Sequence, residues 1–126
     1  MQNKLLIKTC HSCGATVKVM LGFDSSLPSL QCCGEEMVEC IPNSVDAAVE
    51  KHIPTYEKVE DEIFVKVNHV MEKEHFIEWI TLVAGEKEYT VTLYPEQNPE
   101  VRFPYVPGSC LYAYCNKHGL WKKEVN

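Results

Sequence analysis

The feature that most constrains this chain of 126 residues is a set of four cysteines near its N-terminus. Cys10 and Cys13 form a C-x-x-C pair, and the adjacent pair Cys32-Cys33 follows after a loop of eighteen residues. A C-x-x-C turn places two sulfurs on one side of a tight loop, where both can bind one ion of tetrahedral preference. A glycine follows each pair and supplies the backbone freedom that such turns need. The pattern therefore predicts a metal site built from these four thiols.

The spacing of the thiols leaves the identity of the ion open. A zinc ion that only stabilises a small domain fits the pattern as well as a redox-active iron does. A redox disulfide is disfavoured because no βαβ pattern surrounds the C-x-x-C pair. The odd total of seven cysteines also argues against a closed disulfide framework. The adjacent pair is unusual for a zinc ribbon and should distort the tetrahedron, while His11 is expected to be a solvated bystander.

A second group of candidate ligands lies in the C-terminal part of the chain. Cys115 and His118 are three residues apart, His69 and His75 flank a polar connection, and His52 precedes a proline by two positions. A lone histidine is more often a packed or surface residue than a ligand, but four of them with a Cys-x-x-His motif favour a metal site. Imidazole suits zinc, copper, iron and nickel. Zinc is saturated by four ligands, so five candidates favour an ion of higher coordination number.

Composition and charge exclude several classes of protein. The chain is 45% hydrophobic and 24% charged, which is typical of a globular protein. Its longest apolar run, residues 79–84, is far below the ~20 residues of a membrane-spanning helix. The N-terminal segment has no signal-peptide pattern, so we expect a cytoplasmic protein with reduced thiols. The net charge of −6 argues against nucleic acids and anionic membranes as partners.

Strand patterns dominate the sequence after residue 60. Segments rich in β-branched and aromatic residues occur at 63–67, 76–83, 88–94, 111–114 and 120–123. Ala84-Gly85-Glu86 predicts a hairpin turn between the second and third of them. Short strands separated by glycine and proline, with no clear helical stretch, predict an antiparallel β-sandwich of immunoglobulin-like type.

The first part of the chain is less regular. Residues 15–21 predict one short strand, and residues 30–33 lead into the second cysteine pair. The proline-bounded stretch 40–54 is typical of a linker, with at most one helical turn at 45–51. A domain of about 40 residues usually needs a metal or disulfides to fold. The chain is therefore predicted to be mainly β, with a small metal-stapled domain before the sandwich.

The motifs together resemble one known family. Cys10-x-x-Cys13 with Cys32-Cys33-Gly34-Glu35-Glu36-Met37 resembles the desulforedoxin module. The iron site of the superoxide reductases is similar to Glu50-Lys51-His52-Ile53-Pro54, His69-x5-His75-Phe76-Ile77 and Cys115-Asn-x-His118-Gly-Leu-Trp121. In this order, and over essentially the whole chain, the motifs resemble the desulfoferrodoxin family. Val70 stands where the family often has proline, and the loop before Cys32 is longer than in the smallest desulforedoxins.

The resemblance implies two domains and two iron ions. Residues 1–39 would be a desulforedoxin-like domain with an Fe(Cys)₄ centre at Cys10, Cys13, Cys32 and Cys33. Residues 40–126 would be the superoxide reductase domain. Its iron would be bound by His52, His69, His75, His118 and the thiolate of Cys115.

The resemblance also implies an activity, the one-electron reduction of superoxide to hydrogen peroxide. The family's lysine at the place of Lys51 attracts superoxide, and its glutamate at the place of Glu50 can bind the oxidised iron. The first centre would relay electrons from a rubredoxin-like donor, and the chain would form a homodimer that detoxifies superoxide. Screening acts over about 8 Å at physiological ionic strength, so the local field near the iron outweighs the negative total charge.

Two other classes compete with this interpretation. A copper electron-transfer protein on a β-sandwich also takes cysteine and histidine ligands from one loop, but no methionine follows His118. A zinc-stabilised interaction module without redox activity is the second alternative. Cys40 and Cys110 lie outside the ligand motifs and are expected to be buried free thiols, and Trp79 and Trp121 are expected in the core.

Overall fold

The computed structural model describes residues 4–20 and 26–126, which form two compact units. One unit is Leu5–Ile41, and the other comprises Pro42–Asn126 together with Lys4. Nearly all regular structure in both units is β-strand, with one 3₁₀ helix within the described ranges. The prediction of a mainly β protein is confirmed. No helix in the described part of the chain is long and apolar enough to cross a membrane.

The smaller unit consists of very short strands. A three-stranded antiparallel sheet has the order β2-β1-β5, and a two-stranded hairpin contains the second cysteine pair. The strands are β1 (Ile7–Thr9), β2 (Thr16–Lys18), β3 (Gln31–Cys32), β4 (Glu35–Glu36) and β5 (Val38–Glu39). The strand expected at 15–21 is therefore shorter, and residue 21 lies outside the described residues.

Few apolar side chains are buried in this smaller unit. Among its described residues the buried apolar side chains are Leu5, Ile7, Cys10 and Met37. Four buried side chains stabilise a domain only weakly, because each contributes about 1.5–3 kcal/mol against the chain entropy lost on folding. The unit therefore depends on a further cross-link, which its cysteines can supply by binding a metal.

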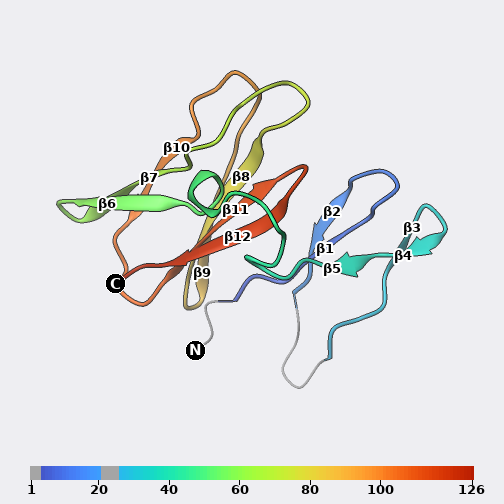
Figure 1. Cartoon of the computed structure of the whole chain (residues 1–126). Helices are drawn as coiled ribbons and strands as arrows, with labels where there is room; N and C mark the ends of the chain where they lie inside the picture. The colour runs from blue at the N-terminus through green and yellow to red at the C-terminus, as the bar shows by residue number, and fades with distance from the viewer. Residues whose placement is uncertain (1–3, 21–25) are drawn as a thin grey trace. The chain divides into compact units, whose positions relative to one another are not determined.

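The larger unit is a sandwich of two antiparallel sheets (Figure 1). One sheet has the order β10-β7-β6 and the other β12-β11-β8-β9. The strands are β6 (Thr55–Val59), β7 (Glu62–Lys66), β8 (Ile77–Ala84), β9 (Lys87–Thr92), β10 (Glu100–Pro104), β11 (Cys110–Cys115) and β12 (Gly119–Glu124). The predicted hairpin turn joins β8 to β9, which pair from Ala84↔Lys87 onward.

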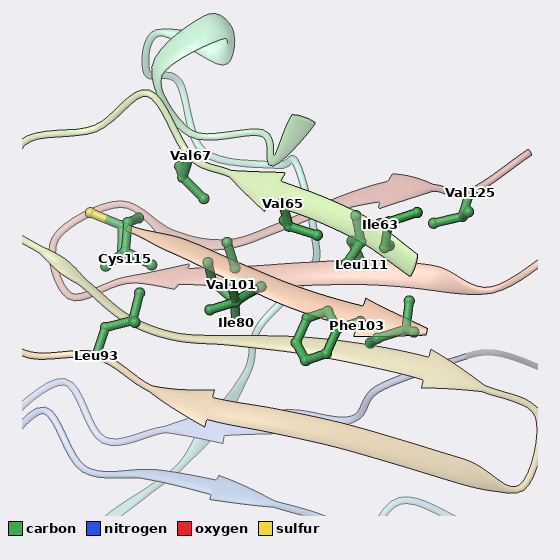
Figure 2. Packing of buried hydrophobic residues seen from close by; sticks show 13 residues of the cluster. Ile63, Val65, Val67, Ile80, Leu93, Val101, Phe103, Leu111, Cys115 and Val125 are labelled. Atoms are coloured by element: carbon green, nitrogen blue, oxygen red, sulfur yellow. The ribbon is translucent and has the colours of Figure 1, made fainter. Parts of the chain in front are cut away.

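Alternation of apolar residues builds the core between the two sheets. In and just after β7, the buried side chains Ile63, Val65 and Val67 alternate with less buried neighbours. They pack against Ile80 and Leu111 of the facing sheet (Figure 2). On β11 the same two-residue period places Leu111, Ala113 and Cys115 in the core cluster. Cys115 is therefore aimed inward by the register of its strand.

Two strands of the sandwich have no counterpart in the sequence prediction. β6 (Thr55–Val59) is an edge strand whose residues are mostly exposed and include two charged side chains, so it shows no apolar alternation. β10 (Glu100–Pro104) buries only Val101 and Phe103 and ends in a proline. The helical turn expected at 45–51 is present as the 3₁₀ helix η1 (Val49–Lys51).

Candidate metal centres

The larger unit brings five candidate ligands together from four segments. His52 follows η1, His69 and His75 lie in the connection between β7 and β8, Cys115 ends β11, and His118 lies in the turn to β12. One ligand atom from each residue lies within 4.8 Å of every other. All five side chains that were predicted from spacing and resemblance thus converge on one point.

The four imidazoles form a closed ring of neighbours. Successive ring centroids are 4.8 Å apart for His52 and His69, 4.6 Å for His69 and His75, 5.1 Å for His75 and His118, and 4.9 Å for His118 and His52. The planes of neighbouring rings meet at angles between 69° and 88°. Four nitrogens arranged in this way surround a point from four sides, with the Cys115 sulfur close to two of the rings.

Backbone carbonyls fix the orientation of two of these rings. The Nδ1–H of His52 donates to the carbonyl of Ala48 at 2.7 Å, and that of His69 donates to the carbonyl of Val70 at 2.5 Å. A ring whose Nδ1 carries the proton presents an unprotonated Nε2, which is the form that binds metals. His69 Nε2 lies 3.4 Å from Cys115 Sγ, so its free lone pair faces the site.

His118 presents its other nitrogen. Its Nδ1 lies 3.1 Å from His52 Nε2 and 3.8 Å from Cys115 Sγ. Metal–imidazole bonds are about 2.1 Å long, so two nitrogens bound at a right angle to one ion lie roughly 3.0 Å apart. The approach of His52 to His118 matches that separation.

His75 gives the clearest sign that a cation belongs at this point. Its Nε2 is buried and has no hydrogen-bond partner among the described residues. Burying an unsatisfied polar nitrogen costs about 1–3 kcal/mol, which a metal–ligand bond would offset. The donor set therefore fits a metal ion of higher coordination number than four.

Burial shapes the protonation of the ligands before a metal binds. Burial raises the pKa of the Cys115 thiol and lowers the pKa values of the His69 and His75 imidazoles. The two imidazoles are therefore neutral near pH 7 and ready to bind a cation, whereas the thiol keeps its proton. A bound cation reverses this preference of the thiol, because thiolate is the form that coordinates.

The smaller unit brings its four cysteines together. The sulfurs of Cys10, Cys13, Cys32 and Cys33 lie within 4.8 Å of one another, with 3.7 Å between Cys13 and Cys32 and 3.9 Å between Cys32 and Cys33. A tetrahedral ion with metal–sulfur bonds of about 2.3 Å holds its ligands roughly 3.8 Å apart. A disulfide requires about 2.05 Å, and all seven cysteines are free thiols.

The adjacent cysteine pair requires an unusual backbone. Cys33 has a φ of +56° and Gly34 a φ of +76° in the turn between β3 and β4. This left-handed conformation is strained for a non-glycine residue. Hydrogen bonding with Cys13 raises the pKa of the Cys32 thiol to about 12, while the backbone of Ala15 lowers the pKa of Cys13.

Glu50 and Lys51 occupy exposed positions in η1, immediately before the ligand His52. Neither belongs to the group of ligand atoms that converge. The sequence motif placed them beside the site, and the structure leaves both side chains at the surface.

For other residues singled out in the sequence, the structure confirms some of the predicted burial and contradicts the rest. His11 is exposed, and Cys110 is a buried free thiol, as expected. Cys40 is a free thiol, as expected, but it is only partly buried, so the prediction of burial was wrong for it. Trp79 is also only partly buried, because it stacks on Tyr114 instead of entering the core between the sheets.

Two residues contact the ligands or their chain neighbours. Trp121 is buried, as expected, and Asn116 was not singled out in the sequence. Trp121 stacks on His52, and Asn116 bonds to both neighbours of His75 in the chain. Both lie inside the Cys115–Trp121 motif, so their position carried a signal. Their contacts depend on tertiary structure and could not be read from spacing.

Comparison with known proteins identifies the family. The family model described as Desulfoferrodoxin matches residues 44–124. This chain belongs to the desulfoferrodoxin family. A desulfoferrodoxin of Syntrophotalea carbinolica is 44% identical over 128 aligned residues, which cover 98% of this chain and 99% of that protein. The two groups of ligands are compatible with the two iron centres of the family.

Two proteins described as superoxide reductases extend the comparison. The crystal structure of the enzyme from Treponema pallidum aligns with a TM-score of 0.69 and 34% identity, covering 83% of this chain and 93% of that one. A superoxide reductase of Pyrococcus horikoshii is 33% identical over 99 residues, covering 60% of this chain and 86% of that protein. The desulfoferrodoxin fold of this chain is thus shared with superoxide reductases.

Proposed function

We propose that this protein is a superoxide reductase. The reaction combines superoxide with one electron and two protons to give hydrogen peroxide, and it releases no dioxygen. The observation that carries the proposal is the closed ring of four imidazoles with one buried thiol. Membership of a family that shares its fold with proteins named superoxide reductases supports it.

We propose that one iron is held by His52, His69, His75, His118 and Cys115. Ferrous iron, if bound by these five side chains, would supply the electron for the reduction of superoxide. The imidazoles are neutral and the single thiolate carries one negative charge. A divalent ion bound there would therefore leave the site net positive, and the site would attract an anion. Burial of the Cys115 side chain keeps water from its sulfur and strengthens the local field.

We assign the guidance of superoxide to Lys51. Lys51 is exposed in η1 and directly precedes the buried ligand His52 in the chain, so it can add positive charge near the site. Superoxide is an anion and the chain carries a net charge of −6, so a local cation has to offset the overall repulsion. A water ordered by the Lys51 ammonium would deliver a proton to the departing product. Glu50 is assigned the role that the resemblance implies, a carboxylate that binds at the site after electron transfer.

We further propose that residues 1–39 form an electron-relay domain and residues 40–126 the reductase domain. The relay would use an iron bound by Cys10, Cys13, Cys32 and Cys33, fed by a rubredoxin-like donor. The convergence of the four sulfurs supports a tetrahedral site but suits zinc equally well. In this account the protein acts as a cytoplasmic homodimer that removes superoxide.

Metal analysis combined with spectroscopy tests the proposal. The protein purified without added metal should contain iron, and its oxidised-minus-reduced spectrum should show bands from thiolate-to-iron charge transfer. Superoxide generated by pulse radiolysis should oxidise the ferrous C-terminal centre in a second-order step. Copper in the C-terminal site would instead indicate an electron-transfer protein, and colourless zinc in both sites an interaction module.

A further inference from the structure

The ligand His75 is carried by a connection outside the regular sheet. Its backbone N–H donates to the carbonyl of Glu72 at 3.1 Å, and its carbonyl accepts from the N–H of Glu72 at 3.0 Å. These two bonds close a small loop but attach it to nothing outside itself. The His75 Nε2 nevertheless has to remain at a buried point shared with ligands from three other segments.

The side chain of Asn116 holds this loop on both sides of His75. Its Oδ1 accepts the backbone N–H of Phe76 at 3.0 Å, and its Nδ2 donates to the carbonyl of Glu74 at 2.9 Å. The backbone N–H of Asn116 also donates to the carbonyl of Phe76 at 3.2 Å. Three hydrogen bonds thus join the two chain neighbours of one ligand to a single residue.

Asn116 is also the residue that follows the ligand Cys115. The β11–β8 ladder shifts register between Tyr114 and Cys115, and its last pair is Cys115↔Ile77. Beyond that pair no regular strand pairing fixes the His75 loop against the end of β11. Here the side-chain amide of Asn116 makes the hydrogen bonds that hold the loop, because it offers donor and acceptor atoms in one fixed plane.

We propose that Asn116 is a positioning residue that fixes His75 relative to Cys115 and His118. Cys115 and His118 lie in the same chelating loop as Asn116, so the amide ties three of the five ligands into one rigid frame. Water can satisfy the exposed polar groups if the amide is removed, but it cannot hold the loop in one place. The inference rests on the proposed ligand set and does not require that the substrate is superoxide.

Removal of the Asn116 amide should loosen the binding of His75 to the metal and leave the other four ligands bound. Asn116→Ala is expected to weaken the affinity for ferrous iron about 10- to 100-fold, the range typical when a supporting partner of a metal ligand is lost, and to release the ion faster to a chelator. The ferric thiolate band should persist, because Cys115 stays bound, but its maximum should shift toward that of His75→Ala. The midpoint potential should move in the same direction as in His75→Ala.

Two further variants separate positioning from general stability. Asn116→Asp keeps the acceptor for the Phe76 N–H but loses the donor to Glu74, so it should give shifts smaller than those of Asn116→Ala. Asn43 is the matched control, since its amide accepts from the N–H of Lys122 at 2.9 Å and donates to the Lys122 carbonyl at 3.4 Å. Asn43→Ala should lower the unfolding temperature without changing the release rate, the band or the potential.

The experiment measures all four variants as holoprotein beside the wild type. The proposal is overturned if Asn116→Ala matches the wild type in release rate, band position and potential. It is overturned equally if Asn43→Ala shifts these quantities as much as Asn116→Ala does. Should Asn116→Ala fail to fold, an Asn116→Asp protein with wild-type release rate and band contradicts the proposal. An unchanged spectrum of His75→Ala would instead show that the ligand set itself is wrong.

Discussion

The indole ring of Trp121 lies stacked on the imidazole of His52, with ring centroids 4.8 Å apart and 25° between the planes. The indole Nε1–H also donates to the backbone carbonyl of His118 at 3.1 Å. Trp121 is 1% exposed, so both contacts are shielded from water. One buried side chain therefore supports two of the five candidate ligands, one through its ring face and the other through its backbone.

Substitution of Trp121 should separate these two contacts. Trp121→Phe keeps an aromatic face for His52 and loses the N–H donor, which should cost about 1 kcal/mol in the free energy of unfolding. Trp121→Leu loses the stack as well and leaves a cavity, so we expect a loss of about 2–4 kcal/mol. Denaturant unfolding of the metal-free protein measures both. Equal losses in the two variants would contradict the assigned role of the stack.

Replacement of Lys51 by alanine should slow the second-order reaction with superoxide roughly tenfold at low salt. The rate should also depend less on ionic strength, since one cation near the site is lost. Pulse radiolysis over a series of salt concentrations measures both effects. Lys87→Ala is the control, because Lys87 is an exposed lysine at the start of β9, outside the site. A Lys51→Ala rate equal to that of the control would remove Lys51 from the mechanism.

Replacement of Cys115 by serine should abolish both the ferric thiolate band and the reaction with superoxide. The alkoxide of serine is a harder and far less accessible ligand than thiolate, so charge transfer from sulfur disappears. Absorption and metal content of the purified variant provide the measurement. Cys110→Ser serves as the control, since Cys110 is a buried free thiol outside the ligand group. A persistent band in Cys115→Ser would assign the thiolate to another residue.

Iron binding to the C-terminal site should weaken as the pH falls. Burial raises the pKa of the Cys115 thiol above its ordinary value, so the metal-free site keeps this proton below that pKa. Binding as thiolate must release it, and one released proton makes the apparent affinity rise about tenfold per pH unit between pH 6.5 and 8. The lowered pKa values of His69 and His75 keep both imidazoles neutral there, so they release no proton. Competition with a chelator across this range measures the slope.

A flat affinity profile over the same range would show that no thiol proton is displaced. The Cys110→Ser protein should keep the full slope, because its thiol lies outside the ligand group. The Cys115→Ser protein should bind iron more weakly and with a shallower pH dependence.

Glu78 offers a test of stability that can be made on the metal-free protein. Burial raises the pKa of its carboxyl group, so the folded state favours the protonated form more than the unfolded state does. Its contribution to stability is therefore greatest at low pH and falls as the pH rises from the unfolded pKa through the folded one. Glu78→Gln should remove the cost of burying the ionised carboxylate, so the metal-free variant should be more stable than the wild type at pH 7. The difference between the two proteins should be smaller at pH 4. Thermal unfolding at the two pH values measures the difference.

Much of the sandwich followed from local pattern, because a half-buried strand shows its buried face as a two-residue period. The alternation around Ile63 and Val65 was visible for this reason. Edge strand β6 was not, since its exposed residues carry no such period. The pattern predicted a strand at residues 111–114 and left Cys115 in the turn that follows, whereas β11 extends to Cys115. The Cys-x-x-His spacing and the resemblance both grouped Cys115 with the histidines.

The ligand types could be predicted from the sequence, while their geometry could not. The choice of Nε2 on His69 and Nδ1 on His118 depends on backbone carbonyls and on ring packing that form only in the folded chain. The same is true of Asn116, whose partners lie some 40 residues earlier in the sequence. Spacing identifies residues that can bind a metal, and tertiary hydrogen bonds decide which of their atoms do.

The product yield per superoxide tests the central claim most directly. Ferrous protein, kept reduced by a chemical donor, should convert each superoxide consumed into one hydrogen peroxide with no dioxygen evolved. Dismutation would instead give half a hydrogen peroxide and half a dioxygen per superoxide. We predict one hydrogen peroxide and no dioxygen per superoxide consumed. Dioxygen released in proportion to the superoxide consumed would contradict the proposed reductase activity.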